Sequence, residues 1–255
     1  MNLHRPSLAL AALALLTACG PSQGTAAANR MSPPGARPAA ASQDLTVFAA
    51  SSLTKAFTAE GAAYERAHPG AHLTFSFAGS QALVAQLQQG APADVLATAD
   101  TASMTASGLA GSKVFARNRL AIITPPGNPR GVRTLADLAK PGVKVVLAGP
   151  TVPVGKAAAK ALKAAGVTVK PVSLEQDVKG VVTKVRLGEA DAGIAYVTDV
   201  KSAKGAVVGT NLPEISNSYP IAVAKPGSAA QAFVDFVLSA DGQAVLASFG
   251  FLPPV

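Results

Sequence analysis

The sequence has one cysteine, no tryptophan and few aromatic or charged residues. Because Cys19 stands alone among 255 residues, no disulfide can form within the chain, and burial must stabilise the fold. Charged residues make up 14% of the sequence, well below the usual quarter, whereas hydrophobic residues make up 49%. These proportions predict a globular chain with a large core.

Two further absences narrow the possible functions. The net charge is +8, but lysine and arginine occur singly and without interleaved aromatic residues, which make up only 5%. The pattern argues against nucleic-acid binding and is typical of a solvated surface that mildly attracts anions. No run of about 18 apolar residues follows the N-terminal segment, so we expect no membrane-spanning helix.

The N-terminus has the pattern of an export signal. His4 and Arg5 precede an apolar run over residues 7–16, and Leu16-Thr17-Ala18-Cys19 resembles the bacterial lipobox. We therefore expect residues 1–18 to be a lipoprotein signal peptide and Cys19 to carry the lipid. The protein would be anchored at the outer face of the cytoplasmic membrane. An ordinary secretory signal that happens to end in cysteine is the alternative.

Residues 19–43 are dominated by glycine, proline, serine and alanine, and they predict a flexible tether. After it, short apolar runs alternate with helical patterns. Strands are expected at 45–49, 72–78, 94–98, 120–124, 143–148, 192–197 and 221–224, and helices at 52–67, 80–89, 155–165, 177–187, 229–238 and 241–249.

This alternation predicts an α/β fold with parallel strands covered by helices. The proline-rich segment at 125–129 is the best boundary between two lobes. We expect lobe one to comprise residues 44–120 and 223–255, and lobe two residues 121–222.

Small or polar residues stand where predicted strands lead into helices. In an open α/β sheet the ligand crevice lies at the carboxyl ends of the strands, where free N–H groups at helix starts favour anions. Glycines there would let the backbone approach a ligand, and serines are either ligands or helix caps. The junctions are Ala50-Ser51-Ser52, Ala78-Gly79-Ser80, Pro153-Val154-Gly155 and Gln176-Asp177-Val178.

Seven segments together resemble the molybdate-binding proteins of ABC importers. The resemblance covers roughly residues 44–253, and several ordered motifs are more specific than any one of them. The segments are 48–54 (FAASSLT), 77–80 (FAGS), 90–95 (GAPADV), 97–100 (ATAD), 177–180 (DVKG), 193–199 (GIAYVTD) and 250–251 (GF).

The resemblance implies the two-lobed periplasmic binding protein fold of the second topological type, with the ligand in the interlobe cleft. It implies that Ser52 and Ser80 bind the oxyanion from lobe one. Val154 and Val178 would bind it through main-chain N–H groups from lobe two, and Tyr196 through its phenol.

Molybdenum would thus be bound only as the oxyanion, molybdate or tungstate, with no cofactor and no catalysis. The expected partner is an ABC permease, and we expect a monomer. A site made only of donors suits a fully deprotonated dianion and disfavours phosphate, whose own O–H needs an acceptor. Sulfate and other tetrahedral oxyanions remain alternatives.

One enzyme motif also occurs. Ser52-Leu53-Thr54-Lys55 matches the Ser-x-x-Lys signature of penicillin-binding enzymes. The partner motifs Lys-Thr-Gly and Ser-Asp-Asn are missing from the sequence, so an extracytoplasmic acyl-enzyme is only a remote alternative. His68 and His72 are separated by Pro69-Gly70, which ends the helix, so they are expected to be surface residues and not a metal pair.

The predicted lipid anchor can be tested with Cys19→Ala. The variant cannot be acylated and should move from the membrane fraction to the soluble extracytoplasmic fraction, as followed by immunoblotting after a detergent-free wash. A variant that stays with the membrane would contradict the lipobox interpretation.

Overall fold

The structure is a computed structural model that describes residues 43–205 and 207–254. The predicted signal peptide, Cys19 and the tether up to residue 42 lie outside the described residues. The first strand already begins at Gln43, which moves the end of the predicted tether back by one residue.

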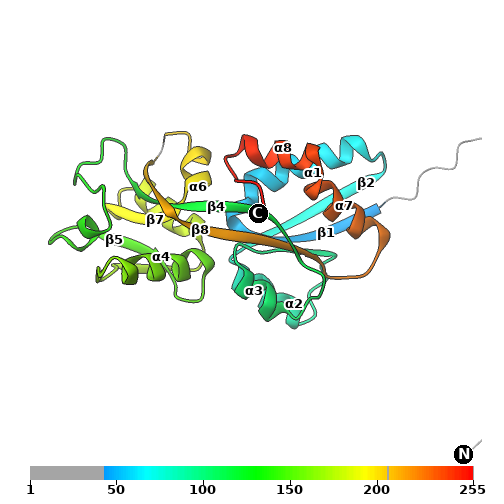
Figure 1. The fold of residues 1–255 in the computed structure, drawn as a ribbon, viewed down its shortest axis with the longest axis horizontal. Helices are drawn as coiled ribbons and strands as arrows, with labels where there is room; N and C mark the ends of the chain where they lie inside the picture. Colours follow the sequence, from blue (N-terminus) through cyan, green and yellow to red (C-terminus); the bar gives the residue numbers. More distant parts are fainter. Residues whose placement is uncertain (1–42, 206, 255) are drawn as a thin grey trace, which may run out of the picture. The chain divides into compact units, whose positions relative to one another are not determined.

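Strands and helices alternate along the chain, as the sequence pattern predicts (Figure 1). The strands are β1 (Gln43–Ala50), β2 (Ala71–Ala78), β3 (Val95–Ala97), β4 (Lys113–Thr124), β5 (Val145–Ala148), β6 (Ser173–Glu175), β7 (Ala192–Tyr196) and β8 (Val208–Val223). The helices are η1 (Ser51–Leu53), α1 (Thr54–Ala67), α2 (Ser80–Gln88), α3 (Thr101–Ser107), η2 (Ala136–Ala139), α4 (Pro153–Ala164), α5 (Val178–Arg186), α6 (Val197–Ser202), α7 (Ser228–Leu238) and α8 (Ala240–Ser248), where η marks a 3-10 helix.

Within the described residues, the strands form one sheet in the order β2-β1-β3-β8-β4-β7-β5-β6. The outer pairs β1–β2, β1–β3, β5–β6 and β5–β7 are parallel. The central pairs are antiparallel, and β4 and β8 run beside each other through the middle of the sheet (Figure 1). The fold is therefore mixed α/β, and the expectation of purely parallel sheets is wrong at its centre.

The two central strands are also much longer than the predicted strands at 120–124 and 221–224. Arg117, Asn118 and Arg119 interrupt the hydrophobic pattern of β4, yet the strand continues through them because β8 supplies main-chain partners. The register between β4 and β8 shifts between Arg119 and Leu120. Asn118 thus lies inside the molecule. It belongs to a stretch of β4 that the sequence periodicity does not predict to be a strand.

Four short elements were also not expected from the sequence: α3, α6, η2 and β6. Helix α3 has few apolar residues, but Asp100 caps it by accepting a 2.7 Å hydrogen bond from the Ser103 N–H. It ends at Gly108, whose φ of 75° suits glycine. Local capping, and not hydrophobic periodicity, defines such a helix.

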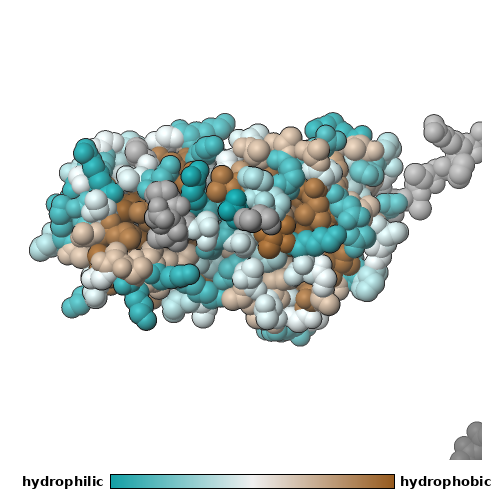
Figure 2. Space-filling view, in the orientation of Figure 1, coloured by the Kyte–Doolittle hydropathy of each residue, from teal (hydrophilic) through white to brown (hydrophobic). Residues whose placement is uncertain are grey.

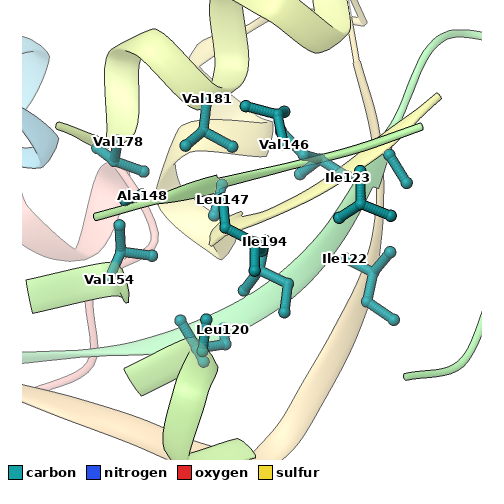
Figure 3. Close-up of a cluster of buried hydrophobic side chains, with 14 of the residues drawn as sticks. Leu120, Ile122, Ile123, Val146, Leu147, Ala148, Val154, Val178, Val181 and Ile194 are labelled. Carbon is teal, nitrogen blue, oxygen red and sulfur yellow. The ribbon is translucent and has the colours of Figure 1, made fainter. Parts of the chain in front are cut away.

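The buried hydrophobic residues separate into clusters on two stretches of chain. One cluster lies within residues 120–207 and is shown in Figure 3. Two others draw on residues 45–116 together with 219–251. We call residues 45–116 together with 219–251 lobe one, and residues 120–207 lobe two. The residue boundaries given above remain a prediction.

On the face shown in Figure 2, hydrophilic side chains are spread along the chain, with smaller hydrophobic patches between them. None of the helices in the described residues has the length and hydropathy needed to cross a membrane.

A buried carboxyl group in α1 predicts a pH-dependent stability. Glu60 is 0% exposed, and within the described residues neither of its carboxyl oxygens has a hydrogen-bond partner. Burial raises the pKa of Glu60 from 4.5 to about 8. Because the folded-state pKa lies above that of the unfolded chain, the native state binds the proton more tightly, and stability falls as pH rises from about 4.5 to about 8.

We expect the free energy of unfolding to fall by on the order of 4 kcal/mol across that range. Glu60→Gln, which cannot ionise, should remove most of this decrease in urea unfolding measured at several pH values. Glu65→Gln on the same helix is the matched control and should leave the decrease in place. A wild-type chain whose stability is constant over this range would contradict the assignment.

Candidate functional site

One narrow cavity lies where several helices begin. Its volume is about 10 Å³, about what one water molecule needs. All five residues implied by the resemblance line it, although they come from distant parts of the sequence. The lining residues are Ala50, Ser51, Ser52, Ala78, Gly79, Ser80, Ala99, Val152, Pro153, Val154, Val178 and Tyr196.

The geometry of the helix starts explains what this cavity can bind. Ser52 belongs to η1, Ser80 opens α2, and Val178 opens α5. In α4 the first residue is Pro153, which has no N–H, so Val154 supplies its first main-chain donor. The N–H groups of a first helical turn lack partners within the helix, and the helix dipole is positive there. The cavity therefore favours an anion without any cationic side chain.

The two valines can contribute only their main chain. Their side chains are 1% and 3% exposed and belong to the core of lobe two. Figure 3 shows Val154 and Val178 on either side of Ala148, near the end of β5. The side chains pack in the core, so the N–H groups are the parts that can face an anion.

The serines do not cap their helices. The starts of η1, α1 and α2 have no side-chain cap. Instead, the Ser52 hydroxyl lies 3.1 Å from the Tyr219 hydroxyl, and Ser80 Oγ accepts a 3.0 Å hydrogen bond from the Ala99 N–H. The interpretation of these serines as plain caps is thus wrong, and both residues line the cavity.

Tyr196 is the last residue of β7 and is 1% exposed. Its hydroxyl accepts a 2.8 Å hydrogen bond from the Asn217 side-chain amide. Burial, followed by the nearby Tyr219, raises the pKa of Tyr196 well above its ordinary value. The phenol therefore keeps its proton.

Sequence reasoning missed a layer of polar residues behind the serines and the tyrosine. Asn118 and Tyr219 are both 0% exposed. The Asn118 amide donates to Thr198 Oγ1 at 2.7 Å and to the Tyr219 hydroxyl at 3.4 Å. Asn118, Asn217 and Tyr219 lie in parts of β4 and β8 that were not predicted as strands. An isolated asparagine between two arginines gives no sequence signal of burial.

An ion pair connects two elements of the site. Asp199 Oδ1 accepts a 2.8 Å hydrogen bond from Lys179 Nζ, and Asp199 Oδ2 accepts one from the Tyr196 N–H at 3.2 Å. Lys179 follows Val178 in α5, so the pair ties the start of that helix to the end of β7. Burial raises the pKa of Asp199, and Lys179 opposes this rise.

Polar contacts also cross the mouth of the cavity between the lobes. Asp100 in lobe one and Lys156 in lobe two form a salt bridge of 3.1 Å. The Gln81 side-chain amide donates to the Gln176 carbonyl at 2.9 Å. Both contacts are solvent-accessible, so they can break when the lobes separate.

Two glycines expected to let the backbone approach a ligand also lie close to other parts of the chain. A Cβ on Gly79 would lie 2.6 Å from the Gln176 carbonyl oxygen across the cleft. A Cβ on Gly155 would lie 2.0 Å from the Gly149 oxygen and 2.6 Å from the Ala148 oxygen. Close packing of α4 on the end of β5, and of lobe one on lobe two, accounts for glycine at these positions.

The arrangement does not support the acyl-enzyme alternative. The Lys55 amine donates to the Ser202 carbonyl, and the Ser52 hydroxyl contacts Tyr219. No hydrogen bond joins Ser52 to Lys55 within the described residues. In the part of the chain that the structure describes, no three or more histidine, cysteine, aspartate or glutamate side chains cluster in a way suited to a metal ion.

Comparisons with known proteins agree with this geometry. The chain matches the family described as bacterial extracellular solute-binding protein over residues 45–252. It is 40% identical over 250 residues to the molybdate-binding protein ModA of Mycobacterium tuberculosis (strain ATCC 25618 / H37Rv), which covers 94% of this chain and 93% of that protein.

Two solved structures share the fold. The periplasmic molybdate-binding protein of Azotobacter vinelandii has a TM-score of 0.67 and 18% identity, covering 83% of this chain and 100% of that one. The sulfate-binding protein SubI of Mycobacterium tuberculosis H37Rv has a TM-score of 0.73 and 20% identity, covering 83% and 87%. At these identities the structures show the fold alone. They confirm the predicted class, the two-lobed fold of periplasmic binding proteins.

The buried ion pair generates a stability prediction. Lys179→Met leaves the Asp199 carboxylate, 1% exposed, without its cation, and the free energy of unfolding should fall by about 2–4 kcal/mol at neutral pH. The loss should shrink at low pH, because a protonated Asp199 needs no cation. Urea unfolding measures both effects.

Lys184→Met is the matched control. Lys184 lies on the same helix with similar exposure, 34% against 36%, but its partners Glu175 and Glu189 are more exposed than Asp199. It should lose little stability. The double variant Lys179→Met/Asp199→Asn should regain most of the loss, and a double variant as unstable as Lys179→Met would contradict the pairing.

Proposed function

The chain belongs to the family of bacterial extracellular solute-binding proteins, and from that premise we propose that it captures molybdate and delivers it to an ABC permease. The observation that carries the proposal is the convergence of Ser52, Ser80, Val154, Val178 and Tyr196 on one cavity. A relative that matches nearly the whole chain is a molybdate-binding protein. Tungstate, which has the same shape and charge, is proposed as a second ligand.

The chemistry of the donors supports a dianion without protons. The residues that line the cavity can offer it main-chain N–H groups and hydroxyls, and none of them carries a carboxylate. Each donor can pair with an oxygen of a tetrahedral anion, whereas a protonated anion would bring an O–H that needs an acceptor. Sulfate meets the same requirement, so only the size of the closed cavity can separate it from molybdate.

Entry of the ligand requires the lobes to move apart. A cavity of about 10 Å³ is too small for an oxyanion of several heavy atoms. The contacts Asp100–Lys156 and Gln81–Gln176 would open, and β4 and β8, which connect the lobes, would flex near the register shift at Arg119. Catalysis has no place in this cycle of capture and release.

We also propose that the mature chain is tethered by a lipid on Cys19 at the outer face of the cytoplasmic membrane. The motif at residues 16–19 supports this proposal. The chain would act as a monomer, with the tether leaving the folded lobes free to meet the permease.

Calorimetric titration of the soluble domain tests the function directly. Molybdate and tungstate should bind with one site per chain, sulfate more weakly, and phosphate most weakly. Binding of phosphate or sulfate with greater affinity than molybdate would overturn the proposed ligand.

Three variants test the assignment of the site. Ser52→Ala, Ser80→Ala and Tyr196→Phe each remove one neutral donor to a charged acceptor, which is worth about 1.5–3 kcal/mol, so each should weaken molybdate about 10- to 150-fold. For Tyr196→Phe the loss should appear mainly as faster dissociation in stopped-flow measurements, because lobe two engages the anion only on closure.

The melting temperature of each ligand-free variant is the control for folding. Unchanged dissociation constants in well-folded variants would remove these side chains from the site.

A further inference from the structure

The cavity hydroxyls raise a question that the family assignment does not answer. Ser52, Ser80 and Tyr196 can each donate a hydrogen bond, but each can equally accept one. A site that rejects protonated anions needs all three to donate. Neighbouring hydrogen-bond donors must therefore occupy lone pairs of these hydroxyl oxygens.

At Tyr196 that group is Asn217. Its side-chain nitrogen donates to the Ala99 carbonyl oxygen at 3.1 Å and to the Tyr196 hydroxyl at 2.8 Å. A carbonyl oxygen can only accept, so it fixes which end of the amide faces Ala99, and the same NH2 group reaches Tyr196. The tyrosine oxygen thus receives a hydrogen bond, and its own proton is available to an anion in the cavity or to the neighbouring Tyr219 hydroxyl.

At Ser52, Asn118 and Tyr219 together supply the hydrogen bond to the hydroxyl oxygen. Asn118 Oδ1 accepts a 3.0 Å hydrogen bond from the Arg119 N–H, which can only donate and so fixes the orientation of this amide. The Asn118 NH2 group then donates to Tyr219. The Tyr219 and Ser52 hydroxyls lie 3.1 Å apart, and either can be the donor. Because the Tyr219 oxygen already accepts from Asn118, donation by Tyr219 to Ser52 Oγ completes the chain and leaves the Ser52 proton free to face the cavity.

At Ser80 the main chain performs this task. The Ala99 N–H donates to Ser80 Oγ, so this hydroxyl also keeps its proton for the cavity. Ala99 therefore serves two hydroxyls, through its N–H at Ser80 and through its carbonyl, which orients Asn217.

We propose that Asn118, Asn217 and Tyr219 are specificity-determining residues that orient the hydroxyl hydrogen bonds, so that Ser52 and Tyr196 direct their protons toward the anion. The site thereby selects tetrahedral anions that carry no proton. This inference rests on the proposed function, because it concerns the same cavity. Asn118 and Tyr219 are fully buried, so no solvent competes for the hydrogen bond between them.

The test is Asn217→Asp, in which a carboxylate replaces the amide beside Tyr196. A carboxylate accepts the tyrosine proton, and Tyr196 then presents a lone pair to the anion. Titrations with molybdate and with inorganic phosphate are run in mildly alkaline buffer, where phosphate is a dianion that keeps one proton. Because both probes carry two negative charges, repulsion by the new carboxylate largely cancels in the ratio of their affinities.

We expect the molybdate-to-phosphate affinity ratio to fall at least about tenfold in Asn217→Asp. Tyr196 would then offer a lone pair, which repels an oxygen of molybdate but can accept the O–H of phosphate. Asn217→Ala, which frees Tyr196 to turn either way, should give a smaller fall. Asn211→Asp, an exposed position on the same strand, adds the same charge and should keep the wild-type ratio.

If Asn217→Asp does not fold, Tyr219→Phe tests the same idea at Ser52. Without the Tyr219 hydroxyl, Ser52 Oγ can accept, and the ratio should fall several-fold. Wild-type ratios in the folded Asn217→Asp and Tyr219→Phe variants would overturn the inference.

A wild-type chain that does not bind molybdate would contradict the proposed function and not this inference. In that case the same ratio is taken between phosphate and whichever of tungstate or sulfate binds. Preference of the wild type for phosphate over both of these anions would overturn the inference.

Discussion

The antiparallel pairing of β4 with β8 is the interaction on which the rest of the structure depends. These two strands join the sheet halves that carry the separate hydrophobic cores. They also place Asn118, Asn217 and Tyr219 directly behind the cavity. Because the strands are paired along their length, amide groups buried between the lobes have fixed positions relative to the helix starts. A shift of register here would disturb the packing of the lobes and the direction of the cavity hydrogen bonds together.

The proposed site would recognise charge with neutral groups. Helix starts supply N–H groups and a positive potential, and buried hydroxyls complete the set of donors. No cation lines the cavity to be desolvated when the lobes close. The charged residues stand one layer away: Lys179 pairs with Asp199 behind β7, and Lys156 pairs with Asp100 at the mouth. In the proposed arrangement the neutral donors that favour an anion also direct their protons toward it, which would link the fold to the choice of ligand.

Much of the fold and of the candidate site could be predicted from the sequence, but the central strands of the sheet could not. Strands followed by helices, and the junctions at Ser52, Ser80, Val154 and Val178, are visible because periodicity and small residues are local signals. The binding role of these residues came from the resemblance, and the structure adds that they share one cavity. The long strands β4 and β8 could not be predicted, because the polar run Arg117-Asn118-Arg119 has the sequence pattern of an exposed segment. The burial of Asn118 depends on partners about 100 residues away, Tyr219 among them, and on hydrogen bonds that no local pattern encodes.

The most direct measurement of the central claim is a crystal structure of the soluble domain grown with molybdate, with anomalous scattering collected at the molybdenum absorption edge. The account predicts one strong anomalous peak in the cavity, with anion oxygens within hydrogen-bond distance of the Ser52, Ser80 and Tyr196 hydroxyls and of the Val154 and Val178 N–H groups. A peak elsewhere on the chain, or an anion whose oxygens face groups other than these five, would contradict it.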